Sequence, residues 1–227
     1  MDLTVFSFQS ALYAASACTF NYGLTKVLTL ESPINSSYGG HFQFLTIIGL
    51  TASYITVTFG FLGLIVGSKT CLSIKNKIQQ LTLPCEVLIS LLYGGIYAYD
   101  RELLIPKAVN VFLPLHVDFA LHGAPALFLL TDFFLYADKW PKQSLPTLIL
   151  YSILGVAYWF WVHKAYSVNG YFPYPLFSVV DTKGRAMIFV VSILIMFGIY
   201  LTLRSMKAAV SFDKKIVEND SASKKVE

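Results

Sequence analysis

The chain has 227 residues, of which 56% are hydrophobic and only 13% are charged. Because ordinary soluble domains carry about 25% charged residues, this composition argues against a soluble protein. The formal net charge is +4, but the basic residues are spread over short connecting segments and the C-terminal tail, so no nucleic-acid partner is expected. The three cysteines are odd in number and lack metal-ligand spacing, so we expect no disulfide framework, no metal and no cofactor.

Six predominantly apolar runs approach or exceed the roughly 20 residues that a helix needs to cross the hydrocarbon core of a bilayer. In chain order these runs are Leu3–Thr25, Phe42–Ser68, Leu81–Tyr97, Leu113–Tyr136, Leu145–Val162 and Ala186–Leu203. The sequence therefore predicts an all-α integral membrane bundle of about six transmembrane helices. Glu86 interrupts the third run, and we expect it near the basic end of that span, where its carboxylate reaches water.

The second run carries a stripe of small residues at steps of three and four. Its members are Thr46, Gly49, Ser53, Thr56, Gly60, Gly63 and Gly67. Such a stripe lies along one face of a helix and lets another helix approach closely. From periodicity alone, packing is the favoured interpretation of Thr46.

The fourth run is apolar but carries four ionisable side chains, namely His116, Asp118, His122 and Asp132. An aspartate at membrane depth costs about 2.5 kcal/mol or more, so such groups usually face a protein interior or a water-filled cavity and mark functional sites. Asp118 and His122 are four residues apart, so on a helix the carboxylate is placed to orient and polarise the imidazole. Pro125 removes a backbone donor just after His122, which makes this the point where the helix bends most easily.

Aromatic residues and the remaining histidines lie close to the predicted membrane interfaces. Segment 169–177, NGYFPYPLF, combines turn formers with large rings. An aromatic belt is its favoured interpretation, and the alternative is a wall of a binding pocket. His41 and His116 are interpreted as solvated or hydrogen-bonded belt residues, with His116 also a candidate for the entrance of a site, and His163 as an interfacial anchor.

The distribution of basic residues predicts the orientation in the membrane. Six spans place both termini and segments 69–77 and 138–142 on one side, which collects eleven of the seventeen Lys and Arg residues. By the positive-inside rule this side is the cytosol. The terminal Lys224-Lys225-Val226-Glu227 is similar to a dilysine retrieval signal, which predicts the endoplasmic reticulum membrane. The composition divides the chain into a membrane domain, 1–206, and a charged tail, 207–227, which is expected to be disordered.

Several motifs occur in a recognisable order. They are YGGHFQFLT at 38–46, IYAYDRELLIPK at 96–107, the pair Leu121-His122, and WVH with the later YPLF within 161–177. In this order they resemble the androgen-induced protein family of multi-span membrane threonine hydrolases, which cleave fatty acid esters of hydroxy fatty acids. The resemblance implies that Thr46 and His122 are the catalytic pair. The chain departs from the family pattern at Phe119 and Gly123, where the family has a histidine and a threonine, and at Asp118, where it has an asparagine.

Two hypotheses about function follow. In the first, the chain is an intramembrane lipid esterase in which His122 takes the proton of the Thr46 hydroxyl while Asp118 orients the ring. In the alternative, it is a non-catalytic lipid-binding membrane protein or a transporter. Thr46 and the start of the fourth span fall on the same non-cytosolic side, so the pair is expected to meet, and Pro114 is placed to delay the helix start and bring His122 toward the depth of Thr46. Either hypothesis makes a lipid within the bilayer the partner.

Overall fold

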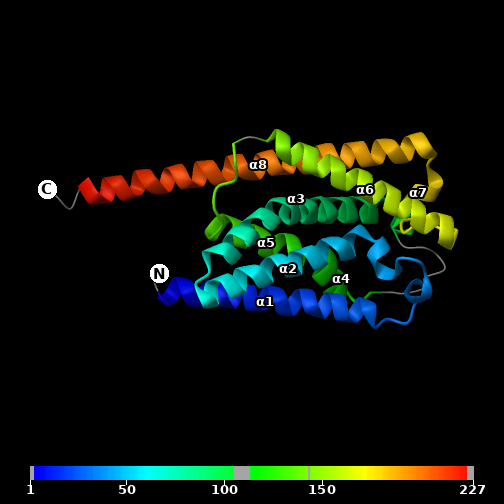
Figure 1. Ribbon diagram of the computed structural model, residues 1–227, viewed down its shortest axis with the longest axis horizontal. Coiled ribbons are helices and arrows are strands. Elements are labelled where there is room, and N and C mark those ends of the chain that lie inside the picture. Colours follow the sequence, from blue (N-terminus) through cyan, green and yellow to red (C-terminus); the bar gives the residue numbers. More distant parts are fainter. Residues whose placement is uncertain (1–2, 105–112, 143, 224–227) are drawn as a thin grey trace.

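The computed structural model describes residues 3–104, 113–142 and 144–223, with side chains described as far as residue 210. Every regular element in these ranges is helical, which confirms the predicted all-α class (Figure 1). The elements are α1 Leu3–Leu28, η1 Pro33–Ser36, η2 Gly40–Gln43, α2 Leu45–Val66, α3 Lys69–Tyr99, η3 Arg101–Leu103, α4 Leu115–His122, α5 Ala124–Leu135, α6 Leu145–Asn169, α7 Leu176–Val179 and α8 Thr182–Ser223.

Helices α2 and α3 form a tight hairpin at the end of the bundle where both chain termini lie (Figure 1). Gly67 ends α2 with φ 67°, in the left-handed region that glycine adopts without strain. Ser68 then caps α3 by accepting a hydrogen bond from the backbone N–H of Cys71 at 3.3 Å. The helix therefore begins at Lys69, and the prediction of a basic loop at 69–77 was wrong because this cap starts the helix before the apolar run does.

Glu86 occupies a different place from the one predicted. It lies seventeen residues after the start of α3, about 25 Å along the helix axis. Its side chain is fully buried, and the hydroxyl of Ser53 on α2 donates to its carboxyl at 2.8 Å. The expectation that Glu86 reaches water was wrong, because α3 begins twelve residues before the predicted Leu81 and carries Glu86 into the bundle.

The small-residue stripe of α2 is a packing face, as predicted. Thr46, Gly49, Ser53, Thr56, Gly60 and Gly63 are all buried. A Cβ atom at Gly60 would lie 2.7 Å from the ring of Tyr13 on α1, and one at Gly49 would lie 2.8 Å from the side chain of Ile89 on α3. Both distances are too short for a real contact, so glycine at these positions lets α1 and α3 approach α2 closely.

The predicted fourth span is broken into α4 and α5, whose axes meet at 45°. The break falls at Gly123, directly after His122, and Pro125 sits in the first turn of α5, where a missing N–H is tolerated. Pro114 is the N-cap of α4, so it delays the helix start as predicted. The hydroxyl of Ser90 on α3 donates to the carbonyl of His122 at 2.5 Å, which satisfies a backbone group at the bend.

Within the described residues, four helices are long and apolar enough to cross a membrane, and the bent pair α4–α5 makes a fifth. These helices are α2, α3, α6 and the part of α8 up to Val210. The remaining predicted span, Leu3–Thr25, is α1, which has 26 residues but carries many uncharged polar side chains and does not reach the same hydropathy. The backbone of α8 stays helical to Ser223, across the predicted domain boundary at 206, and the division itself remains a prediction. Lys224 and Lys225 lie outside the described residues.

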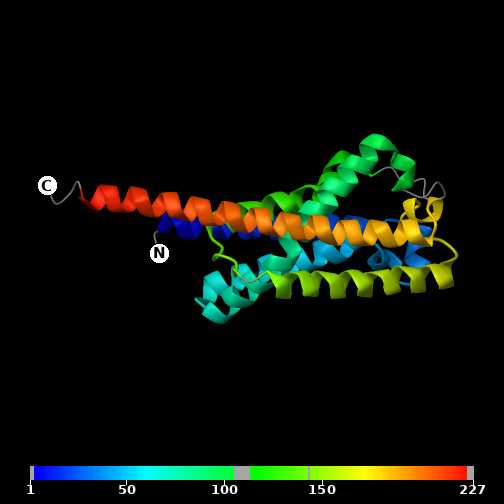
Figure 2. The ribbon, with the colours of Figure 1, turned by 90° about the horizontal axis from the view of Figure 1, so that it is seen from above.

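Helices α6 and α8 pack on each other and flank the side of the bundle formed by α3 (Figure 1). Seen from above, α3 crosses the bundle obliquely, whereas α6 and α8 follow its long axis (Figure 2). The described core is a cluster of large buried side chains from most of the helices, including Tyr13, Phe20, Leu50, Leu83, Leu129, Phe133, Tyr151 and Tyr200. The oblique course of α3 helps to shape the space next to α2 in which the site lies.

Candidate functional site

His122 is the last residue of α4, and its ring is held by two neighbours. Its Nδ1 lies 3.0 Å from Oδ1 of Asp118, one turn earlier on the same helix. The ring of Tyr93 on α3 stacks on the imidazole, with centroids 3.6 Å apart and planes 3° from parallel. Tyr93 also donates its hydroxyl proton to the same Oδ1 at 2.6 Å. The carboxylate is therefore placed to keep a proton on Nδ1, which leaves the lone pair on Nε2 for chemistry.

Thr46 lies in the first turn of α2 and is buried, with 8% of its surface exposed. The loop residue Tyr174 lies against this turn, since its hydroxyl accepts a hydrogen bond from the backbone N–H of Leu45 at 3.0 Å. Burial raises the pKa of Tyr174 above its ordinary value, and hydrogen bonds to Thr46 and Leu45 partly offset that rise. At neutral pH Tyr174 is therefore a neutral hydrogen-bonding group beside the threonine.

Two cavities meet at Thr46. The large cavity has a volume of about 550 Å³, lies among α2, α3, α6, α7 and α8, and is lined almost entirely by apolar side chains. The small cavity has a volume of about 140 Å³ and lies among the end of α1, η1, η2, α2 and α4. Thr46, Tyr93, Leu104 and Tyr174 line both cavities, whereas His122 lines only the small one. The structure thus places Thr46 and His122, the two catalytic candidates, at the wall of one cavity.

The other histidines take different positions. His41 is buried in the wall of the small cavity, and its Nε2 lies 2.7 Å from the side-chain oxygen of Asn35. It is therefore a hydrogen-bonded residue, one of the two states predicted for it, but at the site rather than in a belt. His116 is exposed next to Tyr22 and is not among the residues that line either cavity. His163 packs on Trp159, the residue one turn before it in α6.

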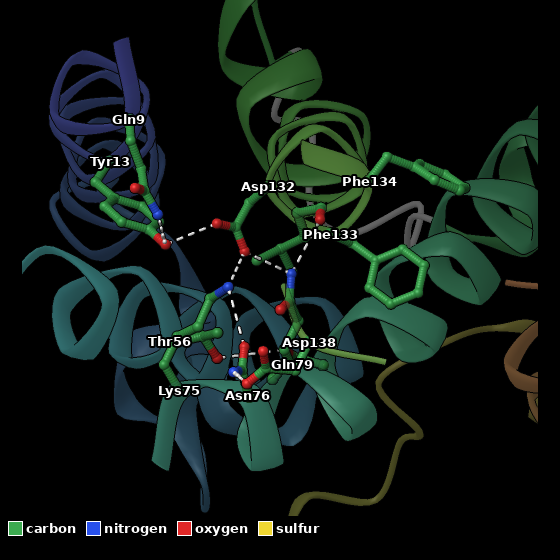
Figure 3. A network of polar contacts seen from close by, with 12 residues as sticks. Gln9, Tyr13, Thr56, Lys75, Asn76, Gln79, Asp132, Phe133, Phe134 and Asp138 are labelled. Atoms are coloured by element: carbon green, nitrogen blue, oxygen red, sulfur yellow. Dashed lines mark hydrogen bonds and ion pairs between the residues drawn. The ribbon is translucent and has the colours of Figure 1, made fainter. Parts of the chain in front are cut away.

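Asp132, the remaining ionisable residue of the predicted fourth span, belongs to a separate polar network (Figure 3). It forms an ion pair with Lys75 and accepts hydrogen bonds from Tyr13 and Gln79, both at 2.7 Å. Gln9 on α1 extends this network through Tyr13. None of these five residues lines either described cavity. The Asp132 network therefore joins α1, α3 and α5 rather than forming part of the site.

Sequence reasoning missed the aromatic residues that complete the site. The loop 169–177 was interpreted as an aromatic belt, but Tyr174 and Phe177 line the large cavity, so the pocket-wall alternative is correct. The sequence around Tyr93 did not mark it as a site residue, because it is one of several tyrosines near the end of α3. Its spacing of three residues from Ser90, which contacts the α4–α5 bend, is the pattern that places it on the same helical face.

The donor set favours acid–base chemistry. Within the described residues, no group of three or more His, Cys, Asp or Glu side chains is arranged to hold a metal ion. A hydroxyl, an imidazole and a carboxylate around one cavity are groups that can serve as a nucleophile, a base and a group that orients the base.

An all-α bundle with several apolar helices of membrane-spanning length is an integral membrane protein. Residues 8–208 match the model of the FAR-17a/AIG1-like protein family, so the chain belongs to this family.

A UPF0641 membrane protein of Schizosaccharomyces pombe is 34% identical over 75% of this chain and 77% of its own length. The human androgen-induced gene 1 protein is 25% identical over 87% of this chain and 89% of its own. The androgen-dependent TFPI-regulating protein of Mesocricetus auratus is 28% identical over 72% of this chain and 74% of its own length. No solved structure shows a significant match.

Proposed function

We propose that the chain is an intramembrane ester hydrolase that cleaves fatty acid esters of hydroxy fatty acids, with Thr46 as nucleophile and His122 as base. The observation that carries the proposal is that Thr46 and His122 line one cavity while Asp118 holds Nδ1 of the histidine. A threonine hydroxyl becomes a competent nucleophile when an adjacent base removes its proton.

The surroundings of the pair support this role. Stacking by Tyr93 and the contact with Asp118 fix the ring of His122 on two sides. A fixed imidazole reduces the entropy that is lost on reaching the reactive geometry. The large cavity falls within the roughly 300–1,000 Å³ range of small-molecule sites, and its apolar lining suits an alkyl chain.

Covalent labelling tests the proposal directly. A fluorophosphonate probe should react with purified protein in detergent, and mass spectrometry of the digest should locate the adduct on Thr46. Thr51→Ala is the matched control, because Thr51 lies on α2, bonds only to the backbone carbonyl of Ile47 and lines neither cavity. Labelling that survives in Thr46→Ala would contradict the proposal.

A non-catalytic lipid-binding protein or transporter is the second candidate, because the large apolar cavity by itself suits a bound lipid. This candidate gives no reason for covalent labelling. Binding of a fluorescent fatty acid with equal affinity by the parent and Thr46→Ala, without labelling or hydrolysis by either, would favour it.

We further propose that the protein resides in the endoplasmic reticulum with both termini in the cytosol. The first and last helices, α1 and α8, place the two chain termini at the same end of the bundle, and η1 lies at the opposite end (Figure 1). Protease added to sealed microsomes should remove a tag placed after Glu227 and spare one inserted at Asn35 in η1. Protection of the C-terminal tag would reverse the orientation.

A further inference from the structure

We infer that the two cavities receive different halves of the ester, with the acyl chain in the large cavity and the alcohol portion in the small one. This inference rests on the proposed function, and it adds the direction in which the substrate binds. It follows from which cavity each reactive side chain lines.

The position of His122 fixes the side on which the alcohol leaves. In hydrolysis by a nucleophile and a base, the same imidazole that takes the hydroxyl proton returns it to the oxygen of the leaving group. The leaving oxygen must therefore lie within hydrogen-bond reach of the imidazole. Because His122 lines only the small cavity, the alcohol portion enters that cavity.

The position of Thr46 fixes the side of the acyl chain. Thr46 lines both cavities, so an ester carbonyl that contacts its hydroxyl lies at their junction. With the alcohol on the His122 side, the remaining direction for the acyl chain is the large cavity. The first step then forms the bond from the Thr46 oxygen to the carbonyl carbon and breaks the ester bond to the alcohol, whose oxygen receives the hydroxyl proton through His122. In the second step water attacks the same carbon, its proton passes through His122 to the Thr46 oxygen, and the fatty acid is released.

Size and lining agree with this direction. The lining of the large cavity includes apolar side chains such as Leu154, Ile193 and Met196, as expected for an alkyl chain. The small cavity, at about 140 Å³, is close to the roughly 150 Å³ cavity that holds a benzene-sized ligand. It also carries the polar side chains of Ser32 and His41. The carbons next to the ester oxygen fit there, so the rest of the hydroxy fatty acid, which is the alcohol portion of the proposed substrate, leaves through the opening of the small cavity.

The test separates the two halves of the substrate. One series holds the alcohol constant, as p-nitrophenyl butanoate, octanoate and hexadecanoate, and a second holds the acid constant, as the butanoate esters of ethanol and dodecanol. Ser192→Phe narrows the large cavity from α8, and Val27→Phe narrows the small cavity from α1. Val191→Phe is the matched control, because Val191 is 45% exposed and lines neither cavity.

We expect Ser192→Phe to lower the hexadecanoate-to-butanoate ratio of kcat/KM by at least about tenfold and to leave the dodecanol-to-ethanol ratio unchanged. Val27→Phe should lower the dodecanol-to-ethanol ratio and leave the hexadecanoate-to-butanoate ratio unchanged. Val191→Phe should change neither ratio. Met196→Ala, which enlarges the large cavity, should raise the hexadecanoate-to-butanoate ratio and so tests the same wall without added bulk. Fluorophosphonate labelling of every variant reports that the site is intact.

Two results would overturn different claims. If Ser192→Phe changes the alcohol ratio and leaves the acyl ratio unchanged, the direction of binding is reversed and the inference fails while the esterase remains. If the parent protein hydrolyses none of the esters and takes no label, the proposed function itself fails.

Discussion

Two carboxylates among the described residues, Asp132 and Asp118, are each paired with a basic side chain, and the two pairs differ in what surrounds them. Asp132 and Lys75 are almost fully buried, are met by Tyr13 and Gln79, and line no described cavity (Figure 3). The side chains of His122 and Asp118 are 13% and 23% exposed, and His122 faces a cavity. The first pair has its polar groups occupied by protein and holds helices together, whereas the histidine of the second pair lies at the wall of a cavity.

Removing one member of the buried pair should give the largest loss of stability. Asp132→Leu leaves the Lys75 ammonium buried without its partner, and such changes cost about 3–5 kcal/mol. Thermal unfolding in detergent measures this loss. Asp138→Leu is the matched control, because Asp138 is exposed and bonds to Asn76 at 2.7 Å, so its loss should cost at most about 1 kcal/mol.

The double variant Lys75→Met with Asp132→Leu sharpens this prediction. Replacing a buried ion pair by apolar groups of similar volume is often nearly neutral, so part of the lost stability should return, while Tyr13 and Gln79 still lack the acceptor that Asp132 gave them. If the double variant is less stable than Asp132→Leu, the unpaired Lys75 ammonium is not the cause of the lost stability.

Substitutions in the second pair, Asp118 and His122, should change activity more than stability. Asp118→Leu should reduce kcat by about 10²–10⁴, the range that general-base catalysis supplies, and Asp118→Asn should reduce it less because the amide still bonds to the ring. Both variants should unfold within about 1 kcal/mol of the parent. Equal, parent-like rates in the two variants would remove Asp118 from the mechanism.

A smaller effect is expected from Tyr93→Phe. This change keeps the ring stacked on His122 and removes only the hydrogen bond to Asp118. A bond to a charged group contributes about 1.5–3 kcal/mol, so a loss of about 10- to 150-fold in kcat, with KM unchanged, is expected. A rise in KM of similar size, with kcat unchanged, would show that Tyr93 contributes to substrate binding instead.

The smallest effect concerns His41, whose burial lowers its pKa below the ordinary value of 6.5. The folded state therefore favours the neutral ring, and its contribution to stability is present above about pH 6.5 and declines as the pH falls toward the lowered pKa. Between pH 7 and pH 5 the parent protein should lose more thermal stability than His41→Gln, which does not titrate. An identical loss in both proteins would contradict a buried, neutral His41.

Local patterns were enough to predict several features of the fold. The step of three and four in the stripe placed Thr46 on a buried face of α2, and Pro125, just after His122, marked the bend between α4 and α5. The four-residue spacing from Asp118 to His122 predicted their contact, because one helical turn brings such side chains together.

Contacts between distant segments were beyond local patterns. Lys75 is buried because Asp132, far along the chain, meets it inside the bundle, so its charge indicated a loop that does not exist. Tyr174 reaches α2 across 129 residues of sequence, and the burial of Glu86 depends on where the Ser68 cap starts α3. Nothing within a window of one span carries this information.

Hydrolysis by the Thr46 variants shows whether Thr46 is a nucleophile or a packing residue. Thr46→Ala and Thr46→Ser both keep the close contact of the α2 face, so a packing residue would tolerate either change. We expect Thr46→Ala, purified as a monodisperse protein in detergent, to lose hydrolysis of a fatty acid ester of a hydroxy fatty acid, and Thr46→Ser to retain part of it. Adding His122→Ala to Thr46→Ala should cost little more activity. Undiminished hydrolysis by well-folded Thr46→Ala would show that Thr46 is not the nucleophile and would leave it as a packing residue.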